Sequence, residues 1–196
     1  MHAATRTVLG LGATGLGVLG WASLIERNAF VVRRFTVPVL PAGAATLRVL
    51  HVSDLHLVPR QKRKAAWVRS LASLDPDLVI NTGDNLAAED AVPAVLDAFA
   101  ADGARLIIAG HTHGGQVCVP GYGALVTNCD LDTGRVKGLS RWWPGAGSTP
   151  SSAAPPDAAW LEVSAGLGTS PTAPVRLACR PEATLLTLVP AGDAPG

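Results

Sequence analysis

The chain has 196 residues, which is enough for one ordinary domain and a short additional segment. Its 16 basic and 15 acidic residues give a formal net charge of +1, which excludes the basic excess typical of general nucleic-acid binders. No nucleic-acid partner is therefore expected. Hydrophobic residues make up 48% of the chain, a high share for a soluble domain, and the N-terminus accounts for part of it. The three cysteines show no C-x-x-C spacing and cannot all pair within one chain, so buried free thiols are expected.

An uncharged, largely apolar run occupies residues 8–25. A run of about 18 residues just reaches the length needed to cross a bilayer core. Its five glycines are tolerated in membrane helices. Residues 1–35 are therefore predicted to be a membrane anchor or signal segment, and the location to be the cell membrane, through one N-terminal anchor, or outside the cell. A cleaved signal and a buried helix remain alternatives, although no clear A-x-A cleavage site follows the run.

Residues 36–46 are predicted to be an extended connector into a domain that covers residues 47–190. Three apolar runs predict buried strands at residues 47–53, 77–82 and 105–109. Helices are expected between them, over residues 60–74 and 89–101. This order predicts neighbouring parallel strands with right-handed crossovers, so the carboxyl ends of the strands meet at one edge of the sheet.

The last third of the chain is predicted to be rich in short strands and turns. Strands are expected at residues 117–119, 125–127, 160–164, 175–179 and 183–189. The low-complexity residues 144–159 predict a flexible loop, and residues 191–196 a frayed tail. The basic residues 60–64 are interpreted as the solvated face of a helix, with contact to phosphate or anionic lipid as the alternative. Trp142 and Trp143 are interpreted as packing residues, with an apolar substrate groove as the alternative.

Acidic and imidazole side chains follow each of the first three predicted strands. They are Asp54 and His56, then Asp84, then His111 and His113. Carboxylate and imidazole together suit manganese, iron or zinc better than magnesium. A carboxylate such as Asp84 can bridge two ions about 3.5–4 Å apart, the geometry for in-line phosphoryl hydrolysis. We therefore expect one or two divalent ions per chain, with a polar loop carrying two incidental histidines as the alternative.

Three motifs carry a resemblance to a known family. The sequences DLH at 54–56, GDN at 83–85 and GHTHGGQ at 110–116 resemble the calcineurin-like metallophosphoesterases. The likeness is strongest to the bacterial membrane-associated or exported phosphodiesterase branch, and it extends from about residue 47 to residue 189. It implies an α/β fold in which a β-sandwich is flanked by helices. It also implies hydrolysis of a phosphate ester, specifically a phosphodiester, by metal-activated water.

The resemblance also implies a role for each motif residue. Asp54, His56, Asp84 and His113 would hold the first metal ion. Asp84 would bridge to a second ion, to which His111 would belong. Asp84 and His111 are therefore the catalytic candidates.

The chain departs from the family pattern in its centre. The family has a GNH(D/E) motif and a further histidine between the second and third motifs, but the 26 residues between Asp84 and His111 contain no histidine. The resemblance thus predicts a shortened family member, through an in-frame deletion or an error in the gene model, with an incomplete second metal site and impaired hydrolysis. Missing core elements would also expose apolar sheet surface. The alternative is a non-catalytic remnant or module of the same fold that binds a single metal ion or a phosphate. His51, inside the first strand, is interpreted as a packed core residue.

Overall fold

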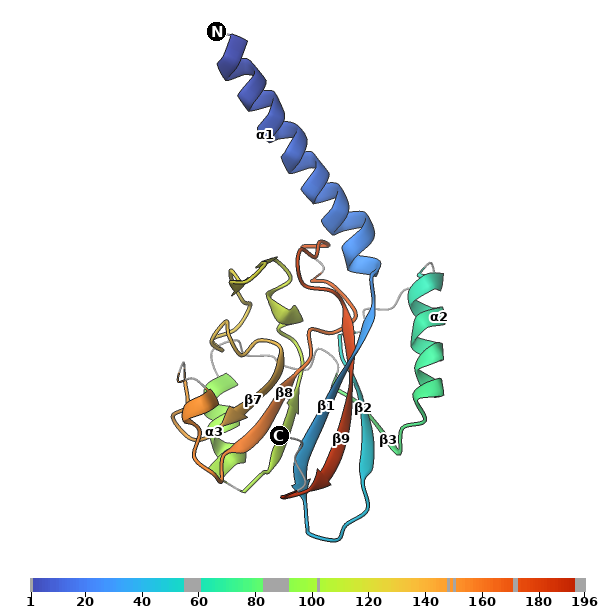
Figure 1. Cartoon of the computed structure of the whole chain (residues 1–196), viewed down its shortest axis with the longest axis vertical. Coiled ribbons are helices and arrows are strands. Elements are labelled where there is room, and N and C mark those ends of the chain that lie inside the picture. Colours follow the sequence, from blue (N-terminus) through green and yellow to red (C-terminus); the bar gives the residue numbers. More distant parts are fainter. Residues whose placement is uncertain are drawn as a thin grey trace.

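The computed structural model of the chain describes residues 2–54, 61–82, 92–101, 103–147, 149, 151–170 and 173–192. It is a mixed α/β structure with two main sheets, and helix α1 (His2–Gly20) projects from one end of it (Figure 1). A π-helical turn (Trp21–Ile25) and a 3-10 turn (Glu26–Asn28) connect α1 to the sheets. The Glu26 carboxylate accepts a hydrogen bond from the backbone N–H of Cys179 at 2.9 Å, which fastens the base of the helix to the domain.

The N-terminal segment does not support the predicted membrane anchor. Within the described part of the chain, no helix combines the length and the apolar character that crossing a membrane requires. The α-helical part ends at Gly20, and glycine and threonine residues dilute the apolar side chains along it.

The larger sheet has the order β1-β9-β2-β3. Its strands are β1 (Val31–Leu40), β2 (Leu47–Val52), β3 (Leu78–Asn81) and β9 (Glu182–Pro190). Strands β2 and β3 are parallel neighbours, as the β-α-β pattern predicts, whereas β9 pairs antiparallel with β2 and parallel with β1. Residues 36–40 belong to β1 and are not a connector. Pro38 is compatible with this strand because β1 lies at the edge of the sheet.

The second sheet contains the third predicted strand. Strand β4 (Leu106–Ala109) pairs parallel with β8 (Ala159–Val163), and β8 pairs antiparallel with β7 (Gly138–Trp142). The prediction that β4 would neighbour β3 is therefore wrong, because β4 finds its partner in a strand more than 50 residues later in the chain. Residues 175–179 are also not a strand: they contribute one isolated bridge, between Val117 and Leu177. Strands β5 (Cys118–Val119) and β6 (Gly123–Ala124) form a small hairpin.

Apolar side chains from both sheets pack against each other. Val37, Val49 and Leu186 from the larger sheet share one cluster with Leu106 and Trp160 from the second sheet. The two sheets therefore face each other across this cluster.

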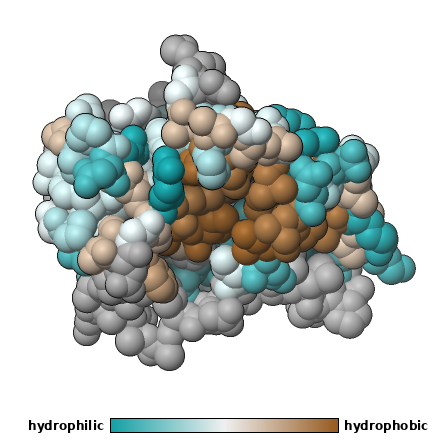
Figure 2. All heavy atoms as spheres, turned by 90° about the horizontal axis from the view of Figure 1, so that it is seen from below, coloured by the Kyte–Doolittle hydropathy of each residue, from teal (hydrophilic) through white to brown (hydrophobic). Residues whose placement is uncertain are grey.

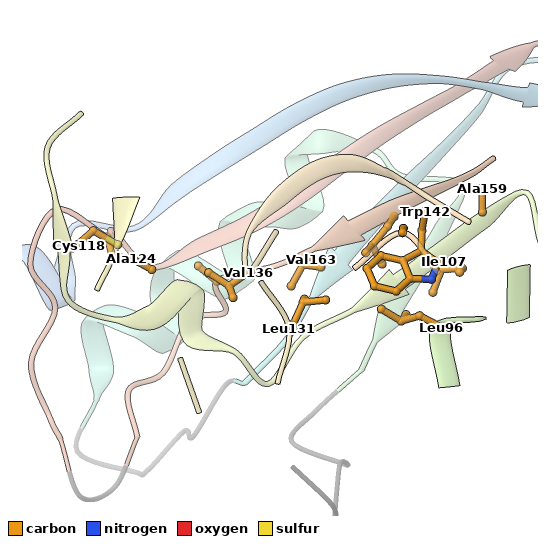
Figure 3. Packing of buried hydrophobic residues seen from close by; sticks show 13 residues of the cluster. Leu96, Ile107, Cys118, Ala124, Leu131, Val136, Trp142, Ala159 and Val163 are labelled. Atoms are coloured by element: carbon orange, nitrogen blue, oxygen red, sulfur yellow. The ribbon is translucent and has the colours of Figure 1, made fainter. Parts of the chain in front are cut away.

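A second apolar cluster, shown from close by in Figure 3, extends from helix α3 (Val92–Ala101) and the three-stranded sheet to Cys118 and Ala124. Trp142 is 1% exposed and lies toward one end of the cluster, beside Leu96 and Ile107 (Figure 3). The indole N–H of Trp142 donates to Oδ1 of Asp97 at 2.9 Å, which satisfies its one polar atom. The packing interpretation of Trp142 is thus confirmed.

Helix α2 (Lys62–Ser70) continues into a 3-10 turn (Leu71–Leu74), so the helix predicted over residues 60–74 is present where the structure describes it. Its inward side carries Lys64, Trp67 and Leu71, spaced by three and four residues as an amphipathic helix requires. Lys64 is only 6% exposed. The interpretation of the basic residues as a solvated face is therefore wrong for Lys64.

Strand β3 leaves apolar surface open. Leu78 and Val79 are 46% and 55% exposed, although strands in parallel pairs are normally covered on both faces. Seen from the end opposite α1, apolar residues gather across the middle of the molecule between polar flanks (Figure 2). Leu78 and Val79 both belong to β3, which lies at one edge of the larger sheet.

The low-complexity residues 144–159 are held to the sheet where they are described. The guanidinium group of Arg141 donates to the carbonyl oxygens of Pro156 at 3.1 Å and Ala158 at 2.7 Å, and it lies over the Trp160 ring. These bonds fasten the second half of the segment to β7 and β8.

Candidate functional site

Asp54 lies directly after β2 and is almost completely buried, with 1% of its surface exposed. Its Oδ2 atom accepts hydrogen bonds from the Ser53 hydroxyl at 2.5 Å and from the backbone N–H of His111 at 3.1 Å. Its Oδ1 atom is buried and has no hydrogen-bond partner among the described residues. An ionised oxygen in that position is costly unless a cation or a donor compensates it.

The double-histidine loop follows β4, so the first and third predicted motifs do meet. Strands β2 and β4 both end on the side of the molecule from which α1 projects (Figure 1). Asn128 also contacts the double-histidine loop. Its side-chain Nδ2 donates to the carbonyl oxygen of His111 at 3.0 Å and lies 3.4 Å from Nε2 of the His111 ring. The sequence contains no signal that assigns this role to Asn128.

Two glycines allow the backbone to close around the Asp54 carboxylate. A Cβ atom on Gly110 would lie 1.9 Å from the Ser53 hydroxyl oxygen and 3.0 Å from Asp54 Oδ2. A Cβ atom on Gly166, in the segment after β8, would lie 2.7 Å from the same Oδ2 atom. Three segments distant in the sequence therefore converge on one carboxylate, and two of them lack side chains at the point of contact.

Backbone strain is concentrated in these loops. Among the described residues, six non-glycine residues have positive φ, and four of them are Asp54, His111, His113 and Gln116. Their φ values lie between 48° and 71°, in the left-handed region that L-residues rarely adopt. Such conformations cluster at functional sites, where the surrounding structure enforces them. Here the enforcing contacts include the Asp54–His111 bond and the Gln116 side chain, which accepts from the backbone N–H of Ser170 at 2.6 Å.

His113 is 4% exposed and opens a short 3-10 turn (His113–Gly115). Thr112 caps this turn, since its hydroxyl accepts from the backbone N–H of Gly114 at 3.2 Å and donates to the carbonyl oxygen of Val136 at 2.6 Å. A pocket of about 170 Å³ lies beside the turn and is lined mainly by polar residues. His113 and Asn128 both line it, so the pocket opens directly onto the loop that carries the predicted ligands.

Arg176 is fully buried and binds backbone carbonyl groups of this region. Its guanidinium group donates to the carbonyl oxygens of Ala165 and Gly168, both at 2.6 Å, and of His113 at 3.2 Å. It therefore ties the histidine loop to the segment that packs against Asp54. Burial lowers the pKa of Arg176 from its ordinary value. Sequence reasoning missed this residue, because a single arginine in a short predicted strand carries no sign of burial.

Two buried thiols lie against the same loop. Cys118 and Cys179 each place their sulfur 3.4 Å from the carbonyl oxygen of Gly114, and neither is in a disulfide. The hydrogen bond between the two thiols, together with the nearby Arg176 and Lys137 charges, lowers the pKa of Cys179 to about 6. The same hydrogen bond, with burial, raises the pKa of Cys118. The prediction of buried free thiols is thus confirmed for these two residues, whereas Cys129 is partly exposed.

His51 is a core residue with a specific set of partners. It is fully buried, and its Nδ1 atom lies 2.5 Å from Oε2 of Glu162 in the opposite sheet. The other oxygen of Glu162 accepts from the Thr184 hydroxyl at 2.8 Å. Nε2 of His51 lies 2.8 Å from the hydroxyl of Thr82, directly before residues 83–91. The core interpretation is confirmed, and the partner Glu162 could not have been identified from the sequence.

The other two predicted ligands, His56 and Asp84, lie outside the described residues. Among the residues that are described, no group of three or more His, Cys, Asp or Glu side chains is placed to hold a metal ion. The described part of the site therefore consists of Asp54, His111 and His113 on two joined loops.

A scan against protein-family models, a search of curated proteins and a search of solved structures each found no match to this chain.

Proposed function

We propose that this chain is a metal-dependent phosphoesterase of the calcineurin-like type, and that it hydrolyses phosphodiesters. The observation that carries the proposal is the buried Asp54 carboxylate: one oxygen is fixed by the histidine loop, and the other has no hydrogen-bond partner within the described chain. That oxygen fits a metal ligand, because a bound cation would remove the cost of burying it. The family resemblance of the three motifs supports the same assignment.

The chain's own residues orient the site. The Ser53 hydroxyl and the His111 N–H hold one carboxylate oxygen, so the rotation of the Asp54 side chain is restricted. Asn128 orients the His111 loop at the edge of the 170 Å³ pocket, where the ester would bind. His56, Asp84 and His113 would complete the ligand set. A divalent ion of the manganese, iron or zinc class would supply water activation and neutralise phosphate charge.

The absent central motif predicts which esters are cleaved. The family assigns protonation of the leaving group to a histidine that this chain lacks, and general acid catalysis contributes about 10²–10⁴-fold. A p-nitrophenolate leaving group needs little protonation, whereas an alkoxide leaving group needs it strongly. We therefore expect a high ratio between the rate of hydrolysis of bis(p-nitrophenyl) phosphate and the rate of hydrolysis of a dialkyl phosphate. This ratio should be larger for this chain than for relatives that have the motif.

The test uses the full chain with manganese, iron or zinc added separately. Turnover of bis(p-nitrophenyl) phosphate is measured for the unmodified chain, for Asp54→Asn and for His113→Gln. Asp75→Asn is the matched control, since its side chain is 97% exposed and far along the chain from the motifs. Both site variants are expected to lose at least about 100-fold in kcat/KM, because each removes a ligand.

Metal stoichiometry separates hydrolysis from simple binding. One to two ions per chain with turnover support the proposal. If metal binding is lost in Asp54→Asn, and the unmodified chain shows no more turnover than this variant, the chain belongs to the non-catalytic alternative. Equal turnover in the Asp54→Asn, Asp75→Asn and unmodified chains would show that the activity does not come from this site.

A further inference from the structure

A second pocket, of about 340 Å³, lies where three segments meet: the base of the N-terminal helix, the start of α2 and the segment after β8. All three segments are at the same end of the molecule (Figure 1). Arg27 and Asn28 line one side, Lys62, Arg63 and Lys64 another, and Thr169 a third. Among the described residues, Asp54, His111 and His113 do not line this pocket, although Gly166, three residues before Thr169, packs against the Asp54 carboxylate.

The charged side chains among the described lining residues of this pocket are all cationic. Four of the chain's 16 lysine and arginine residues line it, and no acidic side chain is among its described lining residues. Within the described residues, the ion pairs are Arg33–Glu182, Arg48–Asp75 and His51–Glu162, so Arg27, Lys62 and Arg63 are not paired with a carboxylate there. In a chain whose net charge is only +1, this is a local concentration of cations facing a cavity. Such a cavity attracts and holds anions.

The position of Lys64 adds an independent argument. It occupies the inward side of α2, one turn before Trp67, where an apolar side chain is expected. Burial and the neighbouring Arg176 and Arg27 charges lower its pKa to about 8. A bound anion would favour the charged forms of Lys64 and of its cationic neighbours. The first N–H groups of α2, a nine-residue helix, open on the same side and favour negative charge as well.

We propose that this pocket binds the phosphate group of a ligand, either a soluble phosphate or the headgroup of an anionic lipid. The tetrahedral phosphate dianion matches the chemistry of the described lining: several strong donors, no carboxylate among those residues, and room for more than one water-sized group. Binding here requires neither the metal ion nor hydrolysis, so it stands or fails independently of the proposed phosphoesterase activity.

The experiment measures binding to the full chain in the presence of EDTA, so that the candidate metal site does not contribute. Inorganic phosphate is titrated calorimetrically at about 0.15 M ionic strength, where long-range attraction is screened. In parallel, flotation is measured with phosphatidylcholine vesicles that do or do not contain phosphatidic acid. The double variant Lys62→Gln/Arg63→Gln removes two exposed cations of the pocket, and its fold is checked by circular dichroism. Arg69→Gln, an exposed cation on the same helix outside the pocket, is the matched control.

Saturable binding of inorganic phosphate, weakened at least about 10-fold in the double variant and less than about twofold in Arg69→Gln, supports a soluble phosphate ligand. Binding only to vesicles that contain phosphatidic acid, with the same response to the variants, supports a lipid phosphate. Binding to neither probe overturns the proposal. Equal weakening in the double variant and in Arg69→Gln also overturns it, since the effect would then come from overall charge.

Discussion

The backbone N–H of His111 donates a hydrogen bond to Oδ2 of Asp54 at 3.1 Å, across 57 positions of the sequence. This bond joins the loop after β2 in one sheet to the loop after β4 in the other. Because both residues have positive φ, each loop holds the other in a conformation that neither would prefer alone. The candidate site is therefore a product of the contact between the two sheets.

The first prediction concerns the close approach at Gly110. In Gly110→Ala the new methyl group would have to displace the Ser53 hydroxyl, which would break its bond to Asp54. We expect a loss of about 1–3 kcal/mol in the free energy of unfolding, the usual cost of overpacking, measured by urea denaturation. Gly12→Ala is the control, since nothing lies within 4 Å of a Cβ atom there. An unchanged midpoint in Gly110→Ala would mean that the two loops are further apart than described.

The second prediction concerns the buried His51–Glu162 pair, which links the two sheets. Glu162→Gln replaces one of the two buried oxygens that contact His51 and the Thr184 hydroxyl, and a buried polar group left without its partner costs about 1–3 kcal/mol. The control is Asp75→Asn. Asp75 faces Arg48 at 3.9 Å on the surface and has a φ of 49°, which asparagine tolerates, so stability should change little. Equal denaturation midpoints for the two variants would contradict a structural role for the buried pair.

The third prediction concerns Arg176. Arg176→Lys keeps the positive charge but replaces a planar group that reaches several carbonyl oxygens at once by a single ammonium. We expect a loss on the order of 2–3 kcal/mol, because buried carbonyl groups of the histidine loop and of residues 165–168 lose their donors. Arg180→Lys serves for comparison, since Arg180 donates to the carbonyl oxygen of Ala29 at an exposed position. If both substitutions have the same small effect, Arg176 does not hold the loops.

The fourth prediction concerns the pH dependence of stability through Lys64. Its pKa in the folded chain is about 8, below the ordinary value of 10.5, so between these values the unfolded chain binds more protons than the folded one. Stability should therefore rise with pH from about 8 to 10.5. Below pH 8 the side chain is charged in both states, and the full cost of burying it beside Arg27 and Arg176 applies.

Lys64→Met tests this dependence, because the titrations of all other groups are common to both chains. Urea unfolding of the two chains at pH 7.5, 9 and 10.5, without phosphate, should show that any stability advantage of the methionine variant shrinks as the pH rises. A constant difference across this range would indicate that Lys64 keeps its ordinary pKa.

Much of the local structure was accessible from the sequence. The runs at residues 47–53, 77–82 and 105–109 correspond to β2, β3 and β4, because short stretches of β-branched apolar residues have one favoured conformation. Helices α2 and α3 also lie within their predicted ranges, since polar and proline residues mark their ends. The sequence predicted that Asp54 meets the histidine loop, but at the edge of one sheet, whereas the two loops follow strands of different sheets. His56 and Asp84 remain predictions.

What the sequence determined by itself was therefore which segments form strands and helices and which chemical groups their ends carry. Only the tertiary structure decided that β4 joins β8, that Lys64 faces inward, and that Glu162 and Arg176 supply the buried partners of His51 and the histidine loop. The reason is physical. Local propensity acts over a few neighbouring residues, whereas strand partners and buried charges are selected by the packing of segments more than 50 residues apart.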